Sequence, residues 1–114
     1  MSSSYAKGVC AENIACQFLY KKGYIVRHRR YKTLYGELDI VATRQDVLVF
    51  VEVKHRQNMY NAQSSITDHQ KKRMHNAALL LLQHHPEYRQ YDIMRFDAVC
   101  IQDKYRILHI TNII

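Results

Sequence analysis

The sequence has few of the residues that build disulfide frameworks and flexible linkers. It contains three cysteines and one proline in 114 residues. An odd number of cysteines without a Cys-x-x-Cys pair argues against a disulfide scaffold and against a structural zinc site. Cys10, Cys16 and Cys100 are therefore predicted to be small apolar core residues. The single Pro86 leaves no proline-rich linker, and the chain has no internal repeat.

Long apolar runs are also missing. No stretch reaches the roughly 18 apolar residues that cross a bilayer. The serines after Met1 are not followed by the apolar segment of a signal peptide. A chain of this length holds one hydrophobic core. We therefore expect a single domain over residues 1–114, located in the reducing cytoplasm.

Acidic residues are few compared with basic ones. Seventeen Lys and Arg stand against ten Asp and Glu, which gives a formal net charge of +7. Such an excess suggests an anionic partner, either nucleic acid or an acidic membrane face. A merely soluble basic protein is the alternative.

The pattern of apolar residues predicts alternating helices and strands. The chain order is α-β-β-β-α-β-β, which favours an α/β fold with a central mixed five-stranded sheet flanked by helices. The clearest of these elements is strand 47–55, which is apolar on both faces and should therefore lie in the middle of the sheet. The helices are expected at 4–22 and from Ser64 or Ser65 to about His85, and the strands at 24–32, 37–43, 47–55, 91–101 and 105–110.

Charged residues occur where buried side chains are expected. Glu12 lies near the middle of the apolar half of the first helix. Glu52 and Lys54 share one face of the central strand, and Asp39 can approach Glu52 if the strands that carry them pair as a hairpin. Burying an unpaired charge costs several kcal/mol, so these side chains need a partner or a metal.

Two carboxylates beside a lysine suit phosphodiester hydrolysis. Mg²⁺ and Mn²⁺ prefer oxygen ligands, which Asp39, Glu52 and the backbone carbonyl of Val53 would supply. Lys54 could orient the attacking water or stabilise the transition state. The spacing of Asp39 and Glu52-x-Lys54 matches the Asp…Glu-x-Lys signature of metal-dependent nucleases. A pair of ion-paired strand ends is the alternative interpretation.

Other charged residues are candidates for supporting roles. Glu37 faces the same way as Asp39, so it could assist the carboxylates or be a solvated charge at a strand end. The basic residues of the first strand could follow a phosphate backbone, or protect a sheet edge from aggregation. Lys71 and Arg73 lie on different faces of the second helix, with Arg73 on the side of Ala77 and Leu81. Lys71 could approach a phosphate or be solvated. The predicted contacts to nucleic acid are Arg29, Arg30, Lys32, Arg56 and Lys71.

Motifs with a specific order and spacing extend from about residue 5 to residue 101. They are Gly8-x-x-Ala11-Glu12-x-x-Ala15, Gly23-Tyr24, Gly36-Glu37-Leu38-Asp39-Ile40-Val41-Ala42, Val49-Phe50-Val51-Glu52-Val53-Lys54-x-Arg56, Lys71 and Arg95-Phe96-Asp97. With these motifs the chain resembles the YraN-type family of bacterial predicted endonucleases. By resemblance, that family belongs to the restriction-endonuclease-like, PD-(D/E)xK superfamily, and its layout is similar to that of archaeal Holliday junction resolvases.

The resemblance implies a fold, a cofactor and a function. It implies a restriction-endonuclease-like fold, Mg²⁺ or Mn²⁺ and, for the resolvases, a homodimer. It makes Glu12 a further catalytic carboxylate beside Asp39, Glu52 and Lys54. The expected function is a metal-dependent endonuclease acting on DNA, branched DNA included, with DNA rather than RNA or a membrane as partner. A module of the same fold that binds nucleic acid or joins a complex without cleaving is the alternative.

Overall fold

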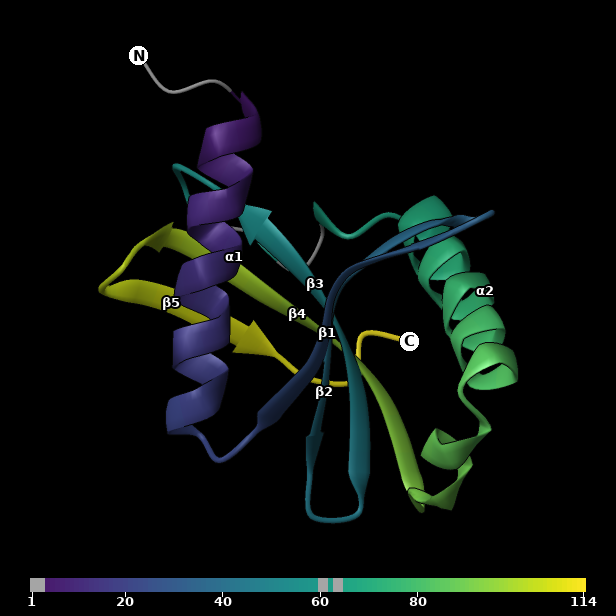
Figure 1. Ribbon diagram of the computed structural model, residues 1–114. Coiled ribbons are helices and arrows are strands. Elements are labelled where there is room, and N and C mark those ends of the chain that lie inside the picture. The colour runs from purple at the N-terminus through teal and green to yellow at the C-terminus, as the bar shows by residue number, and fades with distance from the viewer. Residues whose placement is uncertain (1–3, 60–61, 63–64) are drawn as a thin grey trace.

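A mixed five-stranded sheet with a helix against each face forms the protein (Figure 1). The computed structural model describes residues 4–59, 62 and 65–114, with the backbone alone for residues 4–7 and 9. β3 and β4 are parallel and the other neighbouring strands are antiparallel. The predicted α/β class and element order are confirmed. The elements are α1 (Ser4–Lys21), β1 (Ile25–Thr33), β2 (Gly36–Arg44), β3 (Val47–His55), α2 (Asp68–His84), η2 (Pro86–Gln90), β4 (Ile93–Asp103) and β5 (Arg106–Ile110).

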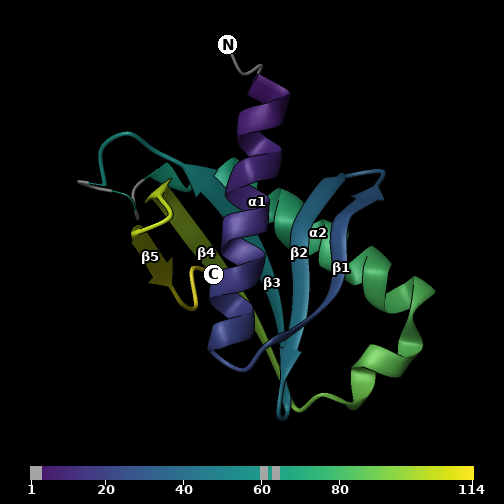
Figure 2. The ribbon, with the colours of Figure 1, turned by 60° about the vertical axis from the view of Figure 1, so that its left-hand side comes forward.

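β3 lies in the middle of the sheet and contributes to two apolar clusters. Alternate side chains of a strand point to opposite faces. Leu48 and Phe50 therefore pack in the cluster beneath α2, while Val49 and Val51 pack in the cluster beneath α1. Figure 2 shows α1 crossing one face of the sheet while α2 lies behind it. The central position predicted for this strand is confirmed, and its bounds are those predicted.

The start of α2 differs from the prediction. Thr67 Oγ1 accepts a hydrogen bond from the Gln70 N–H at 3.1 Å, and the Gln70 side chain accepts one from the Thr67 N–H at 3.0 Å. This reciprocal capping satisfies two helix-end donors, so the helix begins at Asp68. Ser65 is therefore not the cap, and Ser64 lies outside the described residues.

The segment after α2 also differs from the prediction. Pro86 follows the end of the helix, as expected, but it begins the short 3-10 helix η2. Proline fits the first turn of a helix because it has no N–H to leave unpaired. β4 consequently begins at Ile93 rather than at Tyr91.

β2 and β3 separate before β3 ends. Their pairing runs from Arg44 opposite Val47 to Ile40 opposite Val51. Beyond that point β2 continues beside β1, and β3 continues beside β4. Figure 1 shows the β1–β2 hairpin leaning toward α2 while the end of β3 lies near α1. The separation begins at Asp39 and Glu52, the residues that follow the last pair.

The predictions for the three cysteines have different outcomes. Cys100 is buried, as predicted, whereas Cys16 is half-buried and Cys10 is exposed. The prediction is wrong for Cys10, because α1 turns Ala11 and Ala15 to the sheet and leaves Cys10 on its outer side.

Within the described ranges, neither helix has the length and apolar character needed to cross a membrane.

Candidate active site

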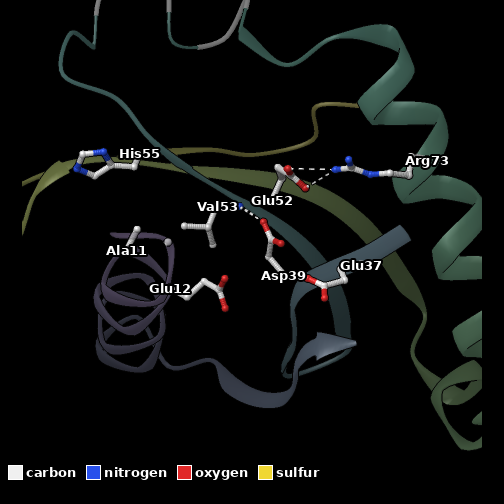
Figure 3. A pocket seen from close by; sticks show the side chains of 9 residues that line it. Ala11, Glu12, Glu37, Asp39, Glu52, Val53, His55 and Arg73 are labelled. Atoms are coloured by element: carbon white, nitrogen blue, oxygen red, sulfur yellow. Dashed lines mark hydrogen bonds and ion pairs between the residues drawn. The ribbon is translucent and has the colours of Figure 1, made fainter. Parts of the chain in front are cut away.

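A cavity of about 420 Å³ opens where β2 and β3 separate (Figure 3). α1 forms one wall, and α2 contributes from the other side of the sheet. In Figure 3 the side chains of Glu12, Asp39 and Glu52 line this one cavity, with the Glu52 carboxylate turned to Arg73 and Asp39 turned to Val53. The structure thus brings together the three carboxylates that the sequence singles out. The lining residues are Gly8, Ala11, Glu12, Glu37, Asp39, Glu52, Val53, His55 and Arg73.

Asp39 is held by the backbone of β3. Its Oδ2 accepts a hydrogen bond from the Val53 N–H at 2.8 Å, across the gap that the separating strands leave. Burial and the neighbouring Glu52 raise the pKa of Asp39 from the usual 3.8 to about 7, and Glu12 adds to this rise. The Val53 hydrogen bond and Arg73 act in the opposite direction. The raised pKa reflects first the burial of the carboxyl and then the neighbouring carboxylates, and a divalent cation would favour the ionised form against both.

Glu52 lies beside two basic side chains. It is buried, with 5% of its surface exposed. Arg73 Nη2 lies 3.2 and 3.3 Å from the two carboxylate oxygens, and Lys54 Nζ lies 3.4 Å from Oε1. Lys54 therefore reaches the site through Glu52, although it does not line the cavity. Together these cations balance a charge that would otherwise be costly to bury.

Glu12 is buried in α1 and paired with β1. Arg30 Nε donates to its two carboxylate oxygens at 3.0 and 3.1 Å. Arg30 has a φ of 52°, which is uncommon for a residue other than glycine. Such a conformation persists only where surrounding contacts hold it, and the pair with Glu12 is one of these contacts. The Arg30 Nε lies against this carboxylate, and the predicted contact of Arg30 to nucleic acid stays a prediction.

The other basic residues predicted to contact nucleic acid lie outside the cavity lining. Arg29 Nη2 donates to Asn13 Oδ1 on α1 at 2.6 Å. Arg56 donates to a neighbouring backbone carbonyl, Lys32 lines a separate hollow between β1 and α2, and Lys71 is half-buried on α2. The structure therefore places these side chains outside the cavity lining, and their phosphate contacts stay predictions.

Sequence reasoning missed Arg73 as a residue of the site. It placed Arg73 on the same side of α2 as Ala77 and Leu81, both of which are buried. A charged residue on a buried helix face is the signal that identified Glu12, and it applied equally to Arg73. His55 also lines the cavity, and no pattern in the sequence indicates it.

The donor set fits an oxygen-ligated cation. Asp39 and Glu52 supply carboxylates, and Val53 supplies a backbone carbonyl beside them. As arranged, no three His, Cys, Asp or Glu side chains of the described residues are close enough together to hold a metal ion. Because Arg73 and Lys54 already contact Glu52, this carboxylate would exchange side-chain cations for the metal ion.

A second buried charge belongs to a separate network. Asp97 is fully buried and accepts hydrogen bonds from Arg95 Nε at 2.9 Å, His109 Nε2 at 2.7 Å and the Asn112 N–H at 3.0 Å. Burial alone would raise the pKa of Asp97, but the hydrogen bonds from His109 and Arg95 lower it overall. Arg95 and Asp97 thus form an ion pair, and the residues of this network do not line the cavity.

Comparison with known proteins identifies the family. The model of the family described as "Uncharacterised protein family UPF0102" matches residues 11–101, which include every carboxylate and cation of the site. A UPF0102 protein of Rhodopseudomonas palustris (strain BisB18) is 41% identical over 102 residues, 90% of this chain and 75% of the relative. One of Nitrobacter winogradskyi is 42% identical over 99 residues, 87% of this chain and 83% of the relative. One of Bradyrhizobium diazoefficiens is 37% identical over 108 residues, 95% of this chain and 80% of the relative. The chain therefore belongs to the UPF0102 family, which is the YraN-type family that its motifs resemble.

Proposed function

We propose that this chain is a Mg²⁺- or Mn²⁺-dependent endonuclease that hydrolyses phosphodiester bonds in DNA in the cytoplasm. The observation that carries the proposal is the meeting of Glu12, Asp39 and Glu52 at one cavity, with Lys54 beside Glu52. Arg30 and Arg73 pair with two of these carboxylates. Among the described residues Asp39 has no ion pair, so its charge lacks the balance that Arg30 and Arg73 give to the other two carboxylates.

Each residue has a chemical task in this proposal. Asp39, Glu52 and the Val53 carbonyl would hold the cation. The bound cation would lower the pKa of water and offset charge at the scissile phosphate. The Lys54 ammonium would orient the attacking water and stabilise the charge of the transition state. Glu12 would add a carboxylate on the α1 wall of the cavity.

The charge of the chain supports a nucleic-acid substrate. The net charge is +7, although four carboxylates lie in the cavity lining. Positive side chains outside the cavity would displace counterions from DNA phosphates, so binding should weaken as salt increases. The preference for DNA over RNA, and the inclusion of branched DNA, rest on the resemblance to the resolvases.

A cleavage panel tests the proposal. Wild-type protein is incubated with single-stranded, duplex, flap and four-way DNA and with RNA, in Mg²⁺, in Mn²⁺ or with a chelator. We expect metal-dependent cleavage that Asp39→Asn abolishes and Asp92→Asn retains, since Asp92 is an exposed aspartate away from the cavity. Absence of cleavage on every substrate would contradict the endonuclease proposal.

The second candidate function is a module that binds nucleic acid or joins a complex without cleaving. The ion pairs of Glu12 with Arg30 and of Glu52 with Arg73 favour it, because they balance two buried charges without a metal. Binding measured on the same substrates separates the two functions. Tight, salt-sensitive binding without cleavage in any metal would support the module.

A further inference from the structure

We propose that Arg73 is a phosphate-binding side chain of this cavity, released from Glu52 when a divalent cation takes that carboxylate. Arg73 would bind the two non-bridging oxygens of the phosphodiester that is to be cleaved. The inference rests on the proposed function, because it needs both the cation and the nucleic acid. Arg73 would be a substrate-binding residue outside the Asp…Glu-x-Lys signature of Asp39, Glu52 and Lys54.

The first support is that only part of the Arg73 guanidinium has a partner. Nη2 contacts Glu52, and Figure 3 shows the side chain reaching it from α2. Nε is buried, yet it has no hydrogen-bond partner among the described residues. A buried donor without an acceptor is unfavourable, so this cost would be relieved if Arg73 left Glu52 and turned its Nε toward an acceptor of a ligand.

The second support is the way β2 accommodates the stem of Arg73. Gly36 has a φ of +124°, and a Cβ atom at this position would lie 2.7 Å from Arg73 Cδ and 3.1 Å from Cγ. Only glycine adopts this backbone conformation easily and also leaves room for the Arg73 stem. The bare backbone of Gly36 therefore positions the stem, while the guanidinium group remains beside the cavity.

The third support is the chemistry of the exchange. A cation bound by Glu52 would repel Arg73 and share the carboxylate oxygens that Arg73 now contacts. A phosphate at the same cation would offer Arg73 two oxygens, which its planar fork can bind together. Lys71, the phosphate contact predicted from the sequence, does not line the cavity and lacks this geometry.

The test compares DNA affinity with and without a divalent cation. Labelled duplex and four-way DNA are titrated with wild type, Arg73→Lys and Arg73→Gln, by fluorescence anisotropy in Ca²⁺ or in a chelator. Ca²⁺ replaces Mg²⁺ as an oxygen-ligated cation so that binding is measured apart from cleavage. Lys72→Gln is the matched control, because Lys72 is the exposed neighbour of Arg73 on the same helix.

We expect Arg73→Gln to weaken binding in Ca²⁺ roughly tenfold or more, as the loss of a charge-assisted hydrogen bond implies. In the chelator its affinity should match that of Lys72→Gln, because Glu52 holds Arg73 in the metal-free protein. Arg73→Lys should be intermediate in Ca²⁺. Thermal unfolding of each variant confirms that the protein compared is folded.

Two results would overturn the inference in distinguishable ways. If wild type gains affinity for DNA in Ca²⁺ and Arg73→Gln gains as much, Arg73 does not bind the phosphate, and the proposed function stands. If wild type binds neither Mn²⁺ in calorimetry nor DNA in anisotropy, the proposed function fails and this inference fails with it.

Discussion

Replacing Asp39 by Asn should make the metal-free protein more stable. Burial and the carboxylates of Glu52 and Glu12 raise the pKa of Asp39 from 3.8 to about 7. Between these values the folded protein binds a proton that the unfolded chain has released. Stability therefore falls as the pH rises from about 4 to about 7, and it stays low above that range. Asp39→Asn removes the charge responsible, while its amide oxygen can still accept the Val53 N–H.

The size of the effect follows from the pKa. A rise from 3.8 to about 7 corresponds to about 4 kcal/mol, at about 1.4 kcal/mol for each pKa unit. Asp39 is half-buried, so solvent screening reduces the expected effect on the free energy of unfolding to roughly 2 kcal/mol. A gain of this size is large compared with the total stability of a small domain.

Urea denaturation in the presence of a chelator measures the effect. At about pH 8 the free energy of unfolding of Asp39→Asn should exceed that of wild type by roughly 2 kcal/mol, and at about pH 4 the two should be nearly equal. Asp92→Asn, which changes an exposed aspartate, should match wild type at both values. A variant that is less stable than wild type at about pH 8 would refute the reasoning.

Three further predictions test other parts of the account. Lys54→Ala should slow cleavage by the equivalent of roughly 3 kcal/mol while DNA affinity remains near that of wild type; wild-type cleavage rates would remove Lys54 from the catalytic residues. Asp97→Asn should lower the free energy of unfolding by about 3 kcal/mol, because Arg95 loses its buried partner; Mn²⁺ affinity should be unchanged, and unchanged stability in urea would contradict the structural role. DNA affinity should fall steeply between low and physiological salt, and it should survive Glu52→Gln; an affinity independent of salt in a binding titration would contradict the electrostatic contribution.

Local patterns were sufficient to predict the sheet and three of the carboxylates of the cavity. The run from Val47 to His55 is apolar on both faces, so its length and central place follow from the sequence alone. Glu12 and Glu52 were recognisable because each interrupts an otherwise apolar face, and Asp39 because its spacing from Glu52-x-Lys54 matches the nuclease signature. A single sequence shows such interruptions wherever periodicity is strong.

The remaining features depend on tertiary structure. The separation of β2 from β3 gives Asp39 access to the Val53 N–H, and no local pattern indicates where two strands part. Arg73 reaches Glu52 only because α2 packs across Gly36, which is distant in sequence. The capping of α2 by Thr67 was missed because nearby serines offer equally good local caps.

Anomalous diffraction from crystals of the protein grown with Mn²⁺ tests the central claim most directly. The account predicts an anomalous peak within coordination distance of one oxygen each of Asp39 and Glu52 and of the Val53 carbonyl, with Arg73 turned away from Glu52. Crystals of Asp39→Asn grown in the same way should lack the peak. A structure at saturating Mn²⁺ with no peak in the cavity, and with Arg73 still paired to Glu52, would contradict the claim.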